Sequence, residues 1–164
     1  MSDEKPVRKL ITPVDLPYRF TPGRAGSRFL KHMAEGKILG QGCQKCGKVY
    51  VPPRGSCPRC GVPTEKEVEV ADRGTVTSFS IVRVPSEGIA IDLPFACLSI
   101  LLDGSDIPFF HVASEVNVED VRMGMRVQAV WKPREEWSAS LESIRYFRPL
   151  DEPDADFDSY KEHQ

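Results

Sequence analysis

Runs rich in Val, Ile, Phe and Thr fill the second half of the chain and are separated by turn residues. Short runs of this kind are typical of β-strands in an all-β domain. The sequence predicts strands at residues 67–71, 74–84, 94–102, 107–113, 126–132 and 142–148. Five main strands, interrupted late by a short helical segment at 117–124, match a small OB-type Greek-key barrel, although a generic sandwich has a similar pattern. We therefore predict a mainly β chain with an OB-type barrel over residues 67–150.

The apolar spacing changes to a helical one near the beginning of the chain. Phe29, Leu30 and Met33 recur at i, i+1 and i+4, and Gly36 stands where a helix commonly ends. We predict one short helix over 24–35 and assign residues 24–40 to this helix and a linker. Its apolar side has two interpretations, a helix packed on its own domain or a docking element for another chain.

The two ends of the chain lack a helical or strand pattern. Residues 1–23 carry Pro6, Pro13, Pro17 and Pro22 without an apolar period, which predicts an extended arm. Residues 151–164 are acidic and almost free of aliphatic side chains, which predicts a frayed tail.

Length and composition narrow the class of protein. The chain has 164 residues, of which 40% are hydrophobic and 28% charged, as in ordinary globular domains. The apolar run at 94–102 is far shorter than the roughly 18 to 20 residues that a membrane helix needs, and no secretory h-region follows Met1. We expect a cytoplasmic protein with no membrane span.

Charge is unevenly distributed. Residues 1–60 contain 12 Lys and Arg against 4 Asp and Glu, whereas residues 61–150 contain 9 against 14 and residues 151–164 contain 1 against 6. Such asymmetry marks either a basic contact surface or solvated faces of opposite sign.

Paired cysteines dominate residues 41–66. Cys43 and Cys46 form one C-x-x-C-G turn, and Cys57 and Cys60 form a second turn ten residues later. Each turn directs two thiolates to one point, and the glycine that follows can adopt the positive φ that such a turn needs. Two turns supply four thiolates at about 2.3 Å from a tetrahedral zinc ion. The spacing predicts a zinc ribbon over 41–66.

Other uses of these cysteines are less well matched. A thioredoxin-like site has one C-x-x-C at the start of a helix, and neither turn has that setting. Iron in a rubredoxin-like site remains open, because the protein ligands for iron and zinc are similar. A catalytic zinc keeps one position open, whereas four cysteines close the shell. We predict a structural Zn²⁺.

The sequence contains no recognisable catalytic motif. It has no dinucleotide-binding glycine pattern, phosphate-binding loop, nucleophile elbow or histidine-based metal motif. Cys97 lies within a predicted strand without a His or Asn partner nearby, and His111 also lies within a strand. We interpret both as packing residues and assign no catalytic residue, so the sequence favours a binding or structural role.

These features together resemble a known family. The ribbon reads Cys43-x-x-Cys46-Gly47-x-x-Tyr50-x-Pro52-Pro53-Arg54-x-x-Cys57-Pro58-x-Cys60-Gly61. A short helix ending in Glu35-Gly36-Lys37 precedes it, and a barrel beginning Gly74-Thr75-Val76 follows. Over residues 24–148 the chain resembles the acyl-CoA-associated OB-fold family with a rubredoxin-like zinc ribbon, known as domain of unknown function thirty-five.

The resemblance implies an accessory role. Members of that family form complexes with thiolase-like or lipid-transfer-protein-like enzymes, which carry the catalytic residues for forming or cleaving C–C bonds in acyl-CoA thioesters. Retro-aldol cleavage in steroid side-chain degradation is one such reaction. We therefore expect a hetero-oligomer in which this chain is not an enzyme on its own.

The residues themselves indicate a contact face. No Asp or Glu occurs from residue 37 to 61, a segment that includes Lys48, Arg54 and Arg59. A basic face of this kind suits CoA phosphates or an acidic partner surface. Together with the apolar Phe29 and Met33, these cations form the predicted CoA- or partner-binding set. The alternative interpretation is that the cations only keep the module soluble.

A single-stranded nucleic-acid-binding protein is the competing class, because zinc ribbons and OB barrels also occur in such proteins. That function needs a basic groove with exposed aromatic side chains on the barrel. The predicted barrel is acidic overall, and its aromatic residues lie in runs that must also supply the core. We therefore expect no nucleic-acid partner.

Overall fold

The structure is a computed structural model and describes residues 19–85 and 90–163. Most of the predicted arm at 1–23 lies outside these residues. The helix is α1 (Gly23–Met33), and the strands are β1 (Ile38–Gly42), β2 (Val49–Tyr50), β3 (Lys66–Val70), β4 (Arg73–Val82), β5 (Phe95–Leu102), β6 (Phe109–Val112), β7 (Arg126–Trp131) and β8 (Ile144–Pro149). Single 3₁₀ turns are η1 (Val118–Asp120), η2 (Arg134–Glu136), η3 (Leu141–Ser143), η4 (Phe157–Ser159) and η5 (Lys161–His163).

The predicted helix forms α1 and packs against its own chain. Phe29 and Met33 are buried in the main hydrophobic core, which also contains residues of the barrel. Gly36 follows the helix with a φ of +74°, and a Cβ at this position would lie 2.4 Å from the ring of Trp137. A glycine is therefore needed where the chain leaves the helix beside the loop between β7 and β8.

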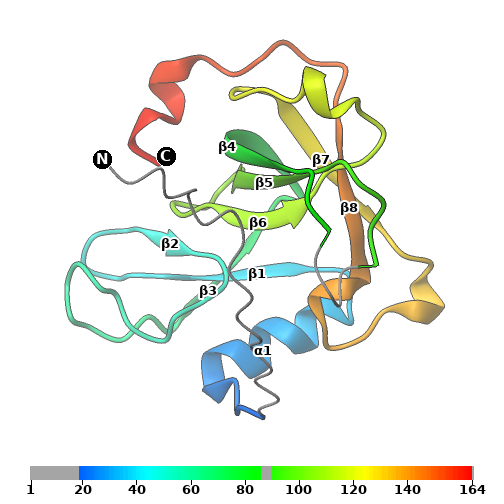
Figure 1. Ribbon diagram of the computed structural model, residues 1–164. Helices are drawn as coiled ribbons and strands as arrows, with labels where there is room; N and C mark the ends of the chain where they lie inside the picture. Colours follow the sequence, from blue (N-terminus) through cyan, green and yellow to red (C-terminus); the bar gives the residue numbers. More distant parts are fainter. Residues whose placement is uncertain (1–18, 86–89, 164) are drawn as a thin grey trace, which may run out of the picture.

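A three-stranded sheet carries the ribbon, in the order β2-β1-β3. β1 was not predicted, because its sequence Ile38–Gly42 contains two glycines and a glutamine, which are poor strand formers. All five of its residues are buried between the neighbouring strands. β3, predicted as the first barrel strand, pairs antiparallel with β1 along its whole length, with Ile38 opposite Val70. Figure 1 shows these three strands beside α1.

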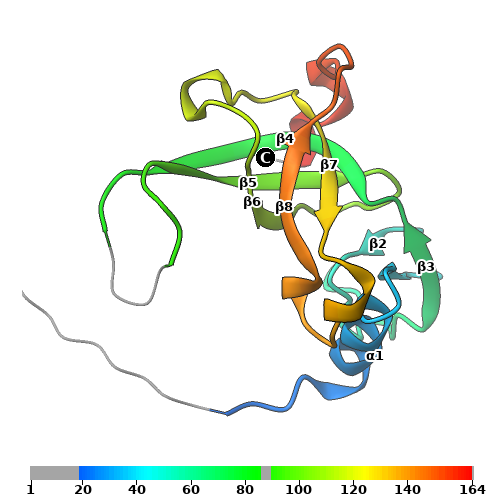
Figure 2. The same cartoon turned by 90° about the vertical axis from the view of Figure 1, so that its right-hand side faces the viewer.

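The second sheet forms the barrel, with five antiparallel strands in the order β6-β5-β4-β7-β8. A parallel bridge between Ala113 and Phe147 joins the two ends of the sheet, β6 and β8. This closure of five strands confirms the predicted mainly β chain with a helix, a ribbon and an OB-type domain. Figure 2 shows β4 and β5 projecting as a hairpin beyond the other strands.

One hydrophobic core extends from the barrel into α1 and the ribbon sheet. Phe109 and Phe147 fill the barrel, and Met33 and Ile38 extend the same cluster to the helix and to β1. A smaller cluster, made of Cys43, Tyr50 and Cys57, lies at the far end of the ribbon. No helix in the described part of the chain has the length and apolarity to cross a membrane.

The acidic end of the chain is not frayed, in contrast to the prediction for 151–164. The backbone N–H of Ala155 donates to the carbonyl of Gly124 at 2.8 Å, and Tyr160 is 5% exposed. Asp154 pairs with Arg122 through two hydrogen bonds of 2.6 and 2.8 Å. The prediction was wrong because the carboxylates of this segment meet arginines of the barrel, which composition alone does not reveal.

Candidate metal centre and its surroundings

The two C-x-x-C-G turns adopt the same backbone geometry. The N–H of Gly47 donates to the carbonyl of Cys43 at 2.9 Å, and the N–H of Gly61 donates to the carbonyl of Cys57 at 2.8 Å. Both glycines have a positive φ, +76° and +67°, and a Cβ at either position would meet nothing within 4 Å. The glycines are therefore required for their backbone conformation and not for space.

The four cysteines form a site of the size that a metal ion needs. The sulfurs of Cys43, Cys46, Cys57 and Cys60 all lie within 4.8 Å of one another, and those of Cys46 and Cys57 are 3.7 Å apart. Ligands at about 2.3 Å from a tetrahedral zinc are separated by about 3.8 Å, so this donor set fits zinc. The four cysteines are therefore positioned to bind a zinc ion. Such a zinc is structural, because a shell of four thiolates leaves no coordination position for a substrate.

Tyr50 supports the metal centre from the strand β2. Its hydroxyl donates to the sulfur of Cys57 over 3.2 Å, and its ring is 3% exposed. This hydrogen bond lowers the pKa of the Cys57 thiol to about 6 and raises the pKa of Tyr50 to about 12. Burial raises the pKa of Cys60 to about 12. The thiolate of Cys57 is thus favoured before the metal binds, whereas the thiol of Cys60 releases its proton to solvent when the metal binds.

The predicted basic residues have different surroundings. Lys48 Nζ lies 3.4 Å from a carboxylate oxygen of Asp106, whose other oxygen accepts the N–H of Val49 at 2.8 Å. The backbone of Asp106 also bonds to Val49 and to His163, at 2.9 Å each. Arg54 stacks on the ring of Tyr50 at 5.9 Å.

Arg54 and Arg59 are both exposed, and neither has a carboxylate partner among the described residues. Lys48 is therefore occupied by a structural contact, whereas Arg54 and Arg59 remain accessible cations.

Phe29 and Met33 do not belong to an accessible face. Phe29 is 3% exposed and Met33 is fully buried. The structure corrects the prediction that their side of the helix is offered to a partner, because α1 uses it to pack on β1 and on η3. The apolar spacing identified the buried side of the helix correctly but not what covers it.

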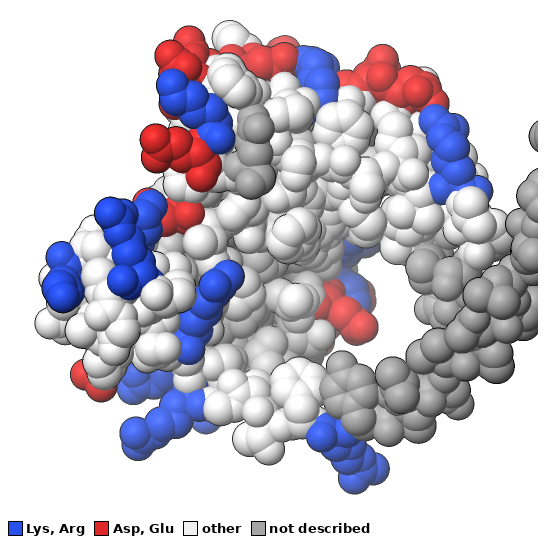
Figure 3. Space-filling model, turned by 60° about the vertical axis from the view of Figure 1, so that its left-hand side comes forward, with Lys and Arg blue, Asp and Glu red and all other residues white. Residues whose placement is uncertain are grey.

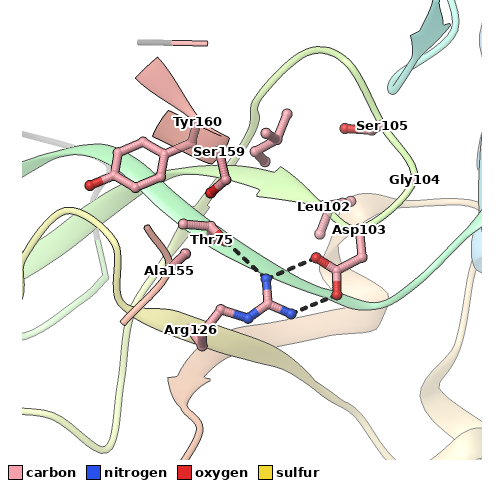
Figure 4. Close-up of a pocket in the computed structure, with 10 residues that line it drawn as sticks. Thr75, Leu102, Asp103, Gly104, Ser105, Arg126, Ala155, Ser159 and Tyr160 are labelled. Carbon is pink, nitrogen blue, oxygen red and sulfur yellow. Dashed lines mark hydrogen bonds and ion pairs between the residues drawn. The ribbon is translucent and has the colours of Figure 1, made fainter. Parts of the chain in front are cut away.

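A polar pocket of about 430 Å³ lies between the barrel and the C-terminal segment. Arg126 donates to both carboxylate oxygens of Asp103, at 2.8 and 2.6 Å, and to the hydroxyl of Thr75 at 2.9 Å (Figure 4). The hydrogen bonds to Asp103 raise the pKa of Arg126. Because this arginine is already neutralised by a bidentate carboxylate, the pocket has no free cation for a ligand.

A more apolar groove of about 740 Å³ contains Cys97, His111 and Tyr146. The Nδ1 atom of His111 is buried without a hydrogen-bond partner among the described residues, and burial lowers the pKa of this imidazole. Its ring packs against Phe109 and Phe147. Cys97 is half-buried on β5. His111 thus packs in the barrel as the sequence suggested, while its orphaned nitrogen could not be predicted.

Sequence reasoning missed two supports of the metal centre. Tyr50 stands between the two turns in the sequence, only seven residues before Cys57, to which it is hydrogen-bonded. Its position could therefore have indicated this contact. Asp106 lies 57 residues from Val49, so no local pattern connects it with the ribbon.

Comparison with known families matches the two modules separately. Residues 31–65 match the family described as "ChsH2, rubredoxin-like zinc ribbon domain". Residues 67–132 match "ChsH2, C-terminal OB-fold domain". The two matches adjoin at the passage from the ribbon into the barrel.

Two curated relatives bear the name "DUF35 domain-containing scaffold protein". The protein from Methanocaldococcus jannaschii is 34% identical over 97 residues, which cover 58% of this chain and 67% of the relative. The protein from Pyrococcus furiosus is 28% identical over 105 residues, which cover 63% of this chain and 76% of the relative.

Solved structures share the fold. A chain of the structure "Ltp2-ChsH2(DUF35) aldolase" superposes with a TM-score of 0.62 at 23% identity, covering 80% of this chain and 98% of that chain. A DUF35 protein of unknown function from Sulfolobus solfataricus gives a TM-score of 0.57 at 25% identity, covering 77% of this chain and 84% of that chain.

Proposed function

The chain belongs to the family of DUF35 domain-containing scaffold proteins, and on that premise we propose that it is a non-catalytic accessory subunit of a thiolase-like, lipid-transfer-protein-like enzyme. Its partner cleaves or forms C–C bonds in acyl-CoA thioesters, as in retro-aldol cleavage of a steroid side chain. The observation that carries the proposal is the match to a named scaffold protein, which covers 58% of this chain, beside the separate family matches to the ribbon and to the barrel.

The metal centre is consistent with a scaffold. Its four thiolates leave no coordination position for a thioester, so the ion holds the ribbon in shape and does not polarise a substrate. The ribbon then presents the exposed cations Arg54 and Arg59, one of them fixed by stacking on Tyr50. These cations suit an acidic surface of the partner subunit.

Apolar contact surface lies on the barrel and not on α1. Phe110 on β6 and Val84 in the loop after β4 are each 73% exposed, and Leu93 before β5 is 38% exposed. These side chains come from the β4–β5 hairpin and from β6, which pairs with β5, and exposed apolar surface of this kind is typical of protein contact sites. The projecting β4–β5 hairpin and the adjacent β6 are therefore the part of the surface that we assign to the partner.

Co-expression with a thiolase-like protein from the same genome tests the proposal. We expect the two proteins to elute together in size-exclusion chromatography, and we expect the partner to turn over its acyl-CoA substrate only in the complex. Phe110→Asp should separate them, because it places a charge in an apolar contact. Phe157→Asp is the matched control, since Phe157 is 53% exposed on the C-terminal segment.

Two results would contradict the accessory role. One is separate elution of well-folded wild-type proteins at micromolar concentration. The other is full turnover by the partner without this chain.

A further inference from the structure

Only the first part of β4 has a neighbouring strand on both sides. β5 pairs with it along almost its whole length, whereas β7 pairs only with Arg73–Thr75. Val76 makes the last backbone hydrogen bonds on the side of β7. From Ser78 to Val82 the outer edge of β4 has no backbone partner among the described residues. This segment, termed the open edge, belongs to the hairpin that projects in Figure 2.

The open edge lacks the protection that exposed strands usually have. Unpaired N–H and C=O groups are a template for another strand, and proteins commonly protect them with charged residues or proline. Neither occurs between Gly74 and Val82, and Arg83, the first charge that follows, is paired with Glu119. Charge is plentiful elsewhere: Figure 3 shows Lys and Arg side chains gathered over the ribbon, with Asp and Glu side chains mainly at the upper end of the molecule.

The side chains of the open edge continue the buried face of the sheet. Phe79 lies opposite Leu98, and Ile81 lies opposite Ala96. Residues directly opposite each other share a face, and both Leu98 and Ala96 are almost completely buried. Phe79 is nevertheless 37% exposed, and Ile81 is only half-buried. The apolar face therefore extends beyond the core, where nothing in the described part of the chain covers it fully.

The sequence of the open edge is complementary to itself in antiparallel pairing. A two-fold axis at Ser80 places Phe79 opposite Ile81 of a second copy, and Ser78 opposite Val82 of that copy. An aromatic side chain directly opposite a β-branched one stabilises a sheet, and the two-fold symmetry forms this pair twice. No two charges are opposed, and at the axis the small side chain of Ser80 meets its own equivalent.

We propose that two copies of this chain associate through their open edges and join their two five-stranded sheets into one antiparallel sheet. The open edge lies on the side of β4 away from β5 and β6. This contact therefore leaves Phe110 free for the proposed partner enzyme, and it does not depend on that partner. The open edge is short compared with the roughly 20 to 30 residues a side of stable complexes, so we expect a dissociation constant in the micromolar range.

Sedimentation velocity of the zinc-loaded full chain, from low micromolar to several hundred micromolar, tests the proposal. We expect the monomer to convert to a dimer over this range. Ser80→Lys should raise the dissociation constant by about tenfold or more, because two ammonium groups would face each other at the axis. Ser80 is exposed, so this substitution should leave the fold intact.

A charge exchange tests the register itself. Ser80→Glu should also be monomeric, whereas an equimolar mixture of Ser80→Lys and Ser80→Glu should form a dimer at least as tight as that of the wild type. Ala139→Lys is the matched control, because it adds the same charge at an exposed position in the loop between η2 and η3. It should leave the dissociation constant within about twofold. Zinc content and thermal unfolding of every variant verify that the fold is retained.

Four results would overturn the assignment. A wild-type chain that stays monomeric throughout the range would exclude self-association. A dimer that tolerates both charges at Ser80 would use another surface, and failure of the mixture to associate would refute the register. Species that keep growing with concentration would contradict a closed two-fold contact. If Ser80→Lys separates the thiolase-like protein from a chain that is monomeric alone, the open edge binds a strand of that enzyme instead.

Discussion

The zinc ribbon and the barrel are stabilised in different ways. The barrel side has an extended apolar core, with Phe109, Phe147 and Ile100 almost completely buried. The hydrophobic cluster at the metal end of the ribbon is small and consists of Cys43, Tyr50 and Cys57, with a few half-buried neighbours. A cluster of that size cannot offset the entropy of ordering the two cysteine turns, so the ribbon depends on its metal while the barrel does not.

The two regions nevertheless share a pair of strands. β1 runs from the main core, where Ile38 lies opposite Val70, into the ribbon, where Gly42 lies opposite Lys66, and β3 returns antiparallel beside it. Loss of structure at the metal end should therefore spread along this strand pair and stop where the apolar core holds the two strands together.

Removing the metal should produce the largest effect. Chelation, or Cys57→Ser, eliminates a metal-binding free energy of about 10 to 16 kcal/mol, so we expect residues 43–64 to lose their structure while the barrel stays folded. Residue-resolved hydrogen exchange with zinc analysis measures both effects. Cys97→Ser is the control and should keep one equivalent of zinc. Unfolding of the barrel together with the ribbon would disprove that the two regions are stabilised separately.

Truncating a core side chain should instead destabilise the fold and leave zinc binding unchanged. Phe147→Ala should lower the free energy of unfolding by about 3 to 5 kcal/mol, and Met33→Ala on α1 by about 2 to 5 kcal/mol, because each opens a cavity in the shared core. Denaturant unfolding measures this loss, and the zinc content at low temperature should not change. Phe110→Ala, at an exposed position, should be close to neutral. A neutral Met33→Ala would place the helix outside the core.

The smallest expected effect concerns the pH at which zinc is released. Donation by Tyr50 lowers the pKa of Cys57, so this thiolate is lost to protonation only as the pH falls through about 6. Tyr50→Phe removes the donor, raises that pKa and should shift the midpoint of zinc release upward by roughly half a pH unit. A zinc-sensitive dye in an acid titration follows the release. Tyr160→Phe is the control, and a downward shift in Tyr50→Phe would contradict the assignment.

Local patterns made the metal centre predictable and left the contacts between modules unpredictable. Four cysteines at fixed spacing specify a site within one segment, and alternating apolar runs indicated the barrel. Val49 and Asp106 are joined across 57 residues, and the central strand β1 is buried despite its glycines. Both features depend on tertiary packing, which overrides local propensity.

The charge and apolar content of each segment could be predicted from the sequence, but not which segments lie together in the structure. The apolar spacing of Phe29 and Met33 shows that one side of a helix is covered, but the covering element is remote in sequence. The acidic terminal segment likewise becomes ordered through Arg122 and other barrel arginines. A groove beside α1 is lined both by Arg24 of the helix and by Arg54 of the ribbon loop, so its charge was visible in the sequence but its shape was not.

The double contact between Asp106 and Val49 has a consequence for the order of folding. β2 contains only two residues, and its outer edge is completed by a loop that follows β5. During synthesis all four cysteines leave the ribosome before Asp106 does, so the nascent ribbon can capture its metal while that edge is still open. Contacts between distant residues form slowly, and we therefore expect the ribbon to close fully only after the β5–β6 hairpin has docked beside it.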